Sequence, residues 1–153
     1  MSRKKSGKLI VATVLTIAAL ASVLVVFASI LGTFQGAPVT VGGVTSGTIE
    51  YSTDNSTFAS STAPSSVGSP WYAQIQVSGY SGPVTITWQL QYESAPSVYS
   101  DVSGASVTTT TTLTGTSQTI YASANGAQTT NYNFGSHITT GGTYIVSVSV
   151  ASA

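Results

Sequence analysis

The sequence predicts an all-β protein with a single antiparallel β-sandwich or jelly-roll domain over residues 44–153. Seven or eight short segments after Leu31 alternate apolar and polar residues, which is the period of a strand with one buried face. Clusters of Gly, Pro, Asn and Asp separate these segments at spacings of about ten residues. No segment after Leu31 has helical periodicity, so a parallel β/α architecture is not expected.

The charge distribution excludes several functions. Only 5% of the 153 residues are charged, against roughly 25% in ordinary soluble domains. All four basic residues precede Leu9, so the body has no cation to neutralise phosphates or to attract anionic lipid headgroups. We therefore expect no nucleic-acid partner. The remaining surface is polar but uncharged, as in secreted wall, pilus and fibre proteins.

Residues 1–31 predict an export or membrane segment. A basic cluster is followed by an uncharged apolar run of 23 residues, from Leu9 to Leu31. A helix of that length spans a hydrocarbon core of roughly 30 Å, and the basic flank stays on the cytoplasmic side. Everything after Leu31 is therefore expected outside the cell or at its surface.

The fate of this hydrophobic helix has two interpretations. Val26-Phe27-Ala28 fits a small-x-small cleavage site, with cleavage between Ala28 and Ser29 or just beyond Leu31. Alternatively the helix is retained after a cut near Gly7, as in type IV pilins, which would leave Lys8 inside the mature helix. The composition of the run suits both interpretations.

Residues 32–43 (GTFQGAPVTVGG) predict a separate extended segment. Ala37, Val39 and Val41 recur with the period of a strand that has one apolar face. Pro38 cannot donate a ladder hydrogen bond, so this strand belongs at an edge or at its own start. The following Gly42-Gly43 provides a pivot. The strand either pairs with its own domain or is donated to another subunit.

Within the body, two segments joined by a short Gly/Pro turn give the strongest strand patterns and are expected to form a hairpin. The turn signals leave residues 59–70 and 93–104 as loops. Strands are expected over residues 44–52, 71–78, 83–92, 107–113, 118–124, 129–134 and 143–151. The buried phase contains Ile75, Val77, Val84, Ile86, Trp88, Leu90, Tyr144, Val146 and Val148. Trp71 and Trp88 share this phase, which favours core packing over a sugar-stacking platform.

The inventory for catalysis is small, and we expect no enzyme, cofactor or metal centre. His137 is the only histidine, there is no cysteine, and no G-x-S-x-G motif selects a nucleophilic serine to act with His137 and Asp101. His137 is expected to cap a loop. The isolated acids are typical of turns, although Glu93 and Asp101 could share a weak calcium site between subunits.

The first third of the chain resembles the TasA and camelysin-like family of biofilm fibre proteins, which includes archaeal bundling pili. The resemblance covers residues 9–52. It rests on the long apolar leader, Phe34 just beyond it, and the strand Ser46-Gly47-Thr48-Ile49-Glu50 after a short apolar segment. The family commonly carries more Lys and Asp than this chain.

The resemblance implies a jelly-roll subunit of an extracellular filament, a homopolymer joined head to tail by donation of the N-terminal strand. Phe34, Ala37, Val39 and Val41 are the expected assembly residues, and other surface filaments are further partners. Two alternatives remain: a pilin whose retained helix packs in the filament core, and a membrane-anchored surface binding domain. The position of the mature N-terminus distinguishes the three.

We predict that Asn55 is glycosylated in native material when the host modifies sequons. Asn55-Ser56-Thr57 is the only N-x-S/T sequon, and it lies in a predicted turn of an exported chain. Intact-mass spectrometry of the native protein checks this. An unmodified Asn55 peptide from a host that glycosylates other sequons contradicts it.

Overall fold

The computed structural model describes residues 30–34, 40–41 and 44–153, with side chains from Gly47 onward. The described strands form two antiparallel sheets around one core, which confirms the all-β expectation. The expected N-terminal helix lies outside the described residues. Among the residues that are described, no helix is long and apolar enough to cross a membrane.

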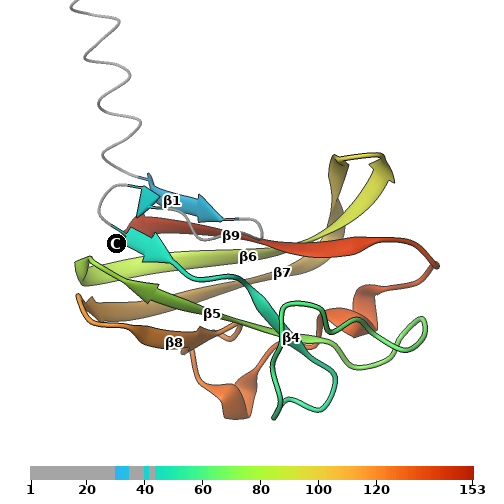
Figure 1. Cartoon of the computed structure of the whole chain (residues 1–153), viewed down its shortest axis with the longest axis horizontal. Coiled ribbons are helices and arrows are strands. Elements are labelled where there is room, and N and C mark those ends of the chain that lie inside the picture. Colours follow the sequence, from blue (N-terminus) through green and yellow to red (C-terminus); the bar gives the residue numbers. More distant parts are fainter. Residues whose placement is uncertain (1–29, 35–39, 42–43) are drawn as a thin grey trace, which may run out of the picture.

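The first sheet has four strands in the order β1-β9-β6-β7 (Figure 1). Their bounds are Ile30–Phe34 for β1, Tyr144–Ser152 for β9, Ser81–Ala95 for β6 and Val98–Thr114 for β7. All neighbours are antiparallel, and β6 is paired along both of its edges. The strand β1 therefore forms one outer edge of this sheet and β7 forms the other.

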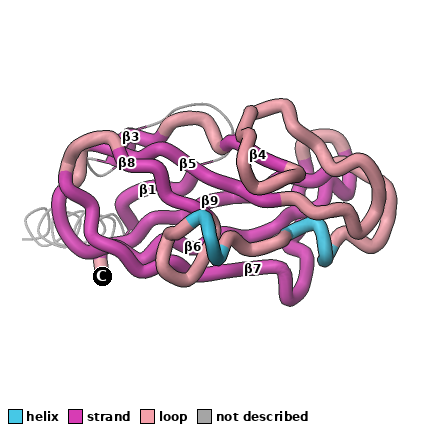
Figure 2. Tube along the Cα trace, turned by 90° about the horizontal axis from the view of Figure 1, so that it is seen from below, coloured by secondary structure: helices cyan, strands magenta, loops and turns pink. Residues whose placement is uncertain are grey.

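The second sheet is centred on β5 (Tyr72–Ser78). One edge of β5 pairs with β3 (Val44–Ser46) and then β4 (Glu50–Ser52), the other with β8 (Gln118–Tyr121), and β2 (Thr40–Val41) pairs with β3. Figure 2 shows β6 and β7 on one side of the molecule and β3, β5 and β4 on the other. Two short 3-10 helices, η1 (Gln128–Thr130) and η2 (Phe134–His137), precede β9.

The core lies between the sheets and follows the predicted phase. Trp88 and its in-phase neighbours on β6 are fully buried, as are the odd-numbered apolar residues of β5 and the even-numbered valines of β9. Trp71 is also buried, so core packing is confirmed for both tryptophans. Tyr144 differs from the prediction, because it lies at the start of β9 and is only half-buried.

Two consecutive side-chain hydrogen bonds cross this core. The Trp88 Nε1–H donates to Thr109 Oγ1 at 3.0 Å, and the Thr109 hydroxyl donates to the carbonyl of Ser123. Thr109 lies on β7, whereas Ser123 follows β8 of the other sheet. A buried hydrogen-bond donor without a partner lowers stability by about 1–3 kcal/mol. These two hydrogen bonds therefore make it possible to bury the Trp88 indole fully.

The predicted hairpin between residues 71–78 and 83–92 is wrong. β5 and β6 belong to different sheets, and the connection at Gly79 (φ 88°) crosses from one sheet to the other. Alternation shows that each strand has one apolar face. It does not distinguish two strands that lie side by side from two strands that face each other across a core.

The loop predicted over residues 93–104 is also wrong. β6 continues to Ala95 and β7 begins at Val98, so the two form a long hairpin. The Ser97 N–H donates to Glu93 Oε1 at 2.8 Å, and Ser97 has a positive φ of 61° in the turn. Ser, Gly and Asp suggested a loop, but backbone pairing holds these strands together where the hairpin carries few buried side chains.

Two other predicted strands are altered. Residues 44–52 divide into β3 and β4, because the chain approaches β5 closely at Gly47, whose N–H donates to the Gln76 carbonyl at 2.7 Å. Residues 129–134 form no strand, and η1 and η2 lie there instead. The sequence of this segment resembles a strand because the rings of Tyr132 and Phe134, two residues apart, both pack inward. The two rings lie edge to face with centroids 4.9 Å apart.

Truncating Trp88 to Ala should lower the free energy of unfolding by about 3–5 kcal/mol, because it leaves a cavity at the centre of the core. Chemical denaturation followed by circular dichroism measures this loss. The exposed Thr112→Ala variant on β7 is the control and should change stability by less than about 0.5 kcal/mol. A small loss for Trp88→Ala would contradict the described core.

Candidate functional site: the outer edge of strand β9

The candidate site is the edge of β9 that faces away from β6. The N-terminal strand β1 pairs there, with Thr33 opposite Ser149 and Phe34 opposite Val148. A bulge lies between Ile30 and Gly32. The pairing covers only the C-terminal half of β9. Among the described residues, no strand pairs with this edge over residues 144–147.

Hydrogen bonds at both ends of β9 define which backbone groups point to this edge. The Thr143 carbonyl accepts from Glu93 N–H, and the Ala153 N–H donates to the Pro83 carbonyl, so odd-numbered residues bond to β6. Because N–H and C=O groups alternate along an antiparallel strand, even-numbered residues point to the outer edge. Tyr144 and Val146 are therefore the edge positions that β1 does not cover.

Tyr51 closes part of this edge from the opposite sheet. It lies on β4, and its Oη accepts a hydrogen bond from the Val146 N–H at 3.3 Å. Its ring stacks on Trp71 with centroids 4.5 Å apart and planes inclined by 19°. Burial raises the pKa of the Tyr51 hydroxyl above its ordinary value.

A cavity of about 380 Å³ adjoins this contact. Its lining comes from both sheets, with Ile49 and Tyr51 on one side and Ile145 and Val146 on the other. Tyr99, from the β6–β7 hairpin, contributes a further wall. Within the described residues, the site therefore combines a strand edge that is paired over only part of its length with an adjacent cavity, the two features that strand addition uses.

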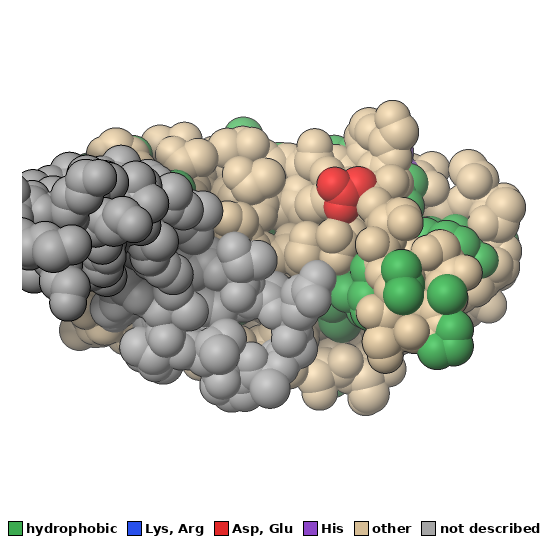
Figure 3. Space-filling model, turned by 90° about the horizontal axis from the view of Figure 1, so that it is seen from above, with side chains coloured by type: hydrophobic (Ala, Val, Ile, Leu, Met, Phe, Trp, Pro, Cys, Tyr) green, Lys and Arg blue, Asp and Glu red, His purple; other side chains and the backbone are tan. Residues whose placement is uncertain are grey.

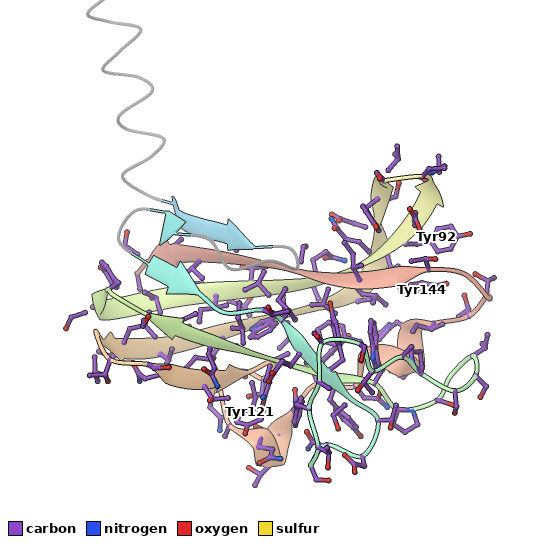
Figure 4. All side chains as sticks on the ribbon, in the orientation of Figure 1. Tyr92, Tyr121 and Tyr144 are labelled. Carbon is purple, nitrogen blue, oxygen red and sulfur yellow. The ribbon has the colours of Figure 1, made fainter. Side chains whose placement is uncertain are left out.

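An aromatic pair marks the end of β9 next to this edge. Tyr92 and Tyr144 lie with ring centroids 5.1 Å apart, at the end of the molecule where the β6–β7 hairpin projects (Figure 4). A side chain at Gly142 (φ 154°) would collide with the Tyr92 ring, so glycine is required there. Tyr144 also borders a second cavity of about 270 Å³ with Trp71.

The surface around this end is apolar in part. Figure 3 shows hydrophobic side chains gathering toward the end where the hairpin and the start of β9 lie, beside an acidic patch on an otherwise polar surface. Val98, at the tip of the hairpin, is 54% exposed. Single exposed apolar side chains are common on protein surfaces, so Val98 bears on a contact only together with the strand edge beside it.

The predicted assembly and cleavage residues remain predictions. Phe34 lies in β1 and Val41 in β2, and the structure describes only their backbone pairing. Ala37 and Val39, together with Ala28 and Ser29 at the predicted cleavage site, lie outside the described residues. Sequence reasoning did not find Tyr51, because a contact between residues 95 positions apart leaves no local pattern.

Asn55, the predicted glycosylation site, is half-buried and has a positive φ of 56°. Its Nδ2 donates to the Gln128 carbonyl at 2.9 Å, and its Oδ1 accepts from Asn131 Nδ2 at 2.9 Å. Gln128 Nε2 also donates to the Asn55 carbonyl, which ties this turn to η1. Modification of Asn55 therefore requires the turn to be open, as it is before folding.

The residues considered for chemistry each have a local partner. The Tyr132 hydroxyl and His137 Nε2 lie 2.6 Å apart and their rings are stacked, which places His137 against the loop before β9. Gln91 Nε2 donates to Asp101 Oδ1 at 2.8 Å, while Glu93 holds the hairpin turn. Within the described residues, no three His, Cys, Asp or Glu side chains gather at a metal-binding distance.

Comparison with known proteins adds no relative. No protein-family model, curated protein or solved structure matches this chain.

The turn beside Asn55 predicts a pH dependence of stability. The backbone N–H of Thr57, the hydroxyl of Ser52 and the backbone N–H of Ser56 hold the pKa of the Asp54 carboxyl well below its usual range. A carboxyl whose pKa is lower in the folded chain stabilises the fold above its unfolded pKa of about 3.9, and this contribution is lost as the pH falls through the folded pKa.

Asp54→Asn should therefore unfold at a lower temperature than wild type at pH 7, and the difference should shrink progressively below about pH 4. Thermal unfolding of both chains from pH 7 to pH 2 measures this. The control is Asp101→Asn on the exposed part of the hairpin. A difference for Asp54→Asn that stays constant or grows in acid would contradict the assignment.

Proposed function

We propose that this protein is a structural subunit of an extracellular filament, with a jelly-roll body, that polymerises by exchange of its N-terminal strand between copies. The observation that carries the proposal is the position of β1. It forms the outer edge of its sheet, and among the described strands it pairs with β9 and with no other. An identical strand from a second copy can take its place, provided that the short pairing of β2 with β3 opens so that the connecting segment can extend.

The direction of β1 fits a linear polymer. β1 runs antiparallel to β9, so the chain beyond Phe34 is directed toward the Tyr144 end of β9. Within one chain, the body resumes at β3, whose Thr45 pairs with Ser78. This pair lies near the start of β6, at the end of the sheet opposite to Tyr144. If β1 of a donor subunit pairs with β9 of an acceptor, the body of the donor can follow beyond the Tyr144 end of the acceptor's β9. The donor chain then does not have to reverse its direction.

The length of the connecting segment fits this arrangement. Residues 35–43 comprise nine residues, which span at most about 30 Å when extended. Four of them suffice to pass residues 147–144 of the acceptor. The other five, at most about 17 Å, remain to reach β3 of the donor. The donor body then lies against the apolar end that contains Tyr92, Tyr144 and Val98.

Such a contact is heterologous, because the strand of one subunit occupies the edge of the next. Repetition of a heterologous contact that does not close on itself produces a filament. Each ladder hydrogen bond contributes about 0.5–1.5 kcal/mol, and the exchanged strand recovers the bonds that β1 makes within one chain. The basic, hydrophobic leader supports export, and the uncharged surface suits close packing of identical subunits.

We predict that Val39→Asp together with Val41→Asp prevents assembly while leaving a folded or weakly folded monomer. Positions 39 and 41 lie where the donated segment leaves the acceptor edge and enters the contact between the two bodies, so both carboxylates would have to be desolvated when that contact forms. Negative-stain microscopy of cell surfaces expressing the full chain compares this double variant with wild type. Removal of residues 32–43 should have the same effect.

The matched control is Thr110→Asp with Thr112→Asp, which places the same two charges at the same spacing on the exposed face of β7. This control should assemble as wild type does. Normal filaments from the Val39→Asp, Val41→Asp chain would contradict strand exchange and favour the pilin with a helix-packed core.

A further inference from the structure

We propose that Tyr51 is a latch on the acceptor edge. Its hydroxyl occupies the ladder position on Val146 that the strand of a second copy needs when it extends along β9 beyond Phe34. This inference rests on the proposed strand exchange and adds to it a competitor that belongs to the acceptor itself. In the unassembled chain the latch satisfies an edge N–H, and in the filament the donated strand displaces it.

The competition follows from the alternation of β9. Val146 and Val148 direct their N–H groups to the same edge, and β1 reaches Val148. Val146 is the next edge position, and its N–H is bonded to Tyr51 Oη. One N–H cannot make a short, linear bond to two acceptors at once. A strand that continues past Phe34 therefore has to release Tyr51.

The incoming group is a backbone carbonyl from residue 36 or 37 of the second copy. A strand that keeps the register of Phe34 with Val148 brings Gly36 opposite Val146. A one-residue bulge, like the one between Ile30 and Gly32, brings Ala37 there instead and turns Ala37 and Val39 toward the core. In both registers the carbonyl opposite Val146 needs the same N–H.

The surroundings of Tyr51 allow the hydroxyl to leave. Its ring packs on one face of Trp71, a contact that does not depend on the hydroxyl. The cavity of about 380 Å³ borders both Tyr51 and Val146, so the ring can shift without a rearrangement of the core. Tyr51 thus has a stacking contact that does not involve its hydroxyl and one long hydrogen bond, of 3.3 Å, that the hydroxyl can exchange.

The Tyr51→Phe variant tests the latch, because it keeps the ring and removes the hydroxyl. The full chain is produced in an exporting host, and the ratio of filamentous to unassembled protein is measured by sedimentation at matched total amounts. Loss of one competing hydrogen bond should raise this ratio by roughly two- to tenfold. Exchange of the Val146 amide hydrogen in the unassembled fraction should accelerate by a similar factor.

The control is Tyr72→Phe on β5. Tyr72 is also half-buried, and its hydroxyl makes no hydrogen bond within the described part of the chain. Its filament ratio and its Val146 exchange should equal those of wild type. Near-UV circular dichroism of the unassembled fraction confirms that the packing of Trp71 is retained in both variants.

A filament ratio for Tyr51→Phe that equals or falls below that of wild type would overturn the latch. Unprotected exchange of the Val146 amide in the unassembled wild-type chain would do the same without any variant. Normal assembly of the Val39→Asp, Val41→Asp chain would instead overturn strand exchange itself. Wild-type filaments that depend on Val39 and Val41 but are indifferent to the Tyr51 hydroxyl would remove the latch alone.

Discussion

The burial of Trp88 between the two sheets is the interaction on which the rest of this structure depends. The body has no disulfide, no metal cluster among its described residues and no lysine or arginine, so apolar burial and hydrogen bonding supply its stability. The indole N–H is satisfied by Thr109, which in turn reaches the strand-end loop of the opposite sheet at Ser123. The same side chain therefore fills the core and fixes how the two sheets are joined.

Strand edges are the second constraint, since many β proteins protect theirs with lysines, which this body lacks. On the β7 edge the protection comes from within the chain. The N–H of Thr110 donates to the Ala124 carbonyl, and the N–H of Thr114 donates to the Gln118 side chain at 2.7 Å. On the β9 edge, the described protection consists of β1 and the single hydroxyl of Tyr51. This contrast between the described parts of the two edges supports the proposal that a partner strand pairs with β9.

The sequence predicted the properties that depend on neighbouring residues and missed those that depend on distant ones. The buried phase of Trp88 and Ile86 followed from alternation within one strand. The separation of β5 and β6 into different sheets did not, because alternation carries no information about which strands pair. The outer hairpin around Glu93 and Asp101 was also missed, since its strands bury few side chains. Of the candidate site, the sequence indicated a strand-patterned segment at residues 37–41, whose donation remains a proposal, whereas the contact between Tyr51 and Val146 had no local signal.

The confinement of all Lys and Arg to the first eight residues also determines how the body responds to its medium. Without Lys or Arg after residue 8, the acids of the body are held by neutral donors: Gln74 bonds to Glu50 at 2.7 Å, and Gln91 bonds to Asp101. Dissolved ions weaken attractions between opposite charges by screening them, with a range of about 8 Å at physiological ionic strength. A body with no lysine or arginine has few such attractions to lose, so screening by added salt should remove little of the stability that ion pairs give to other proteins.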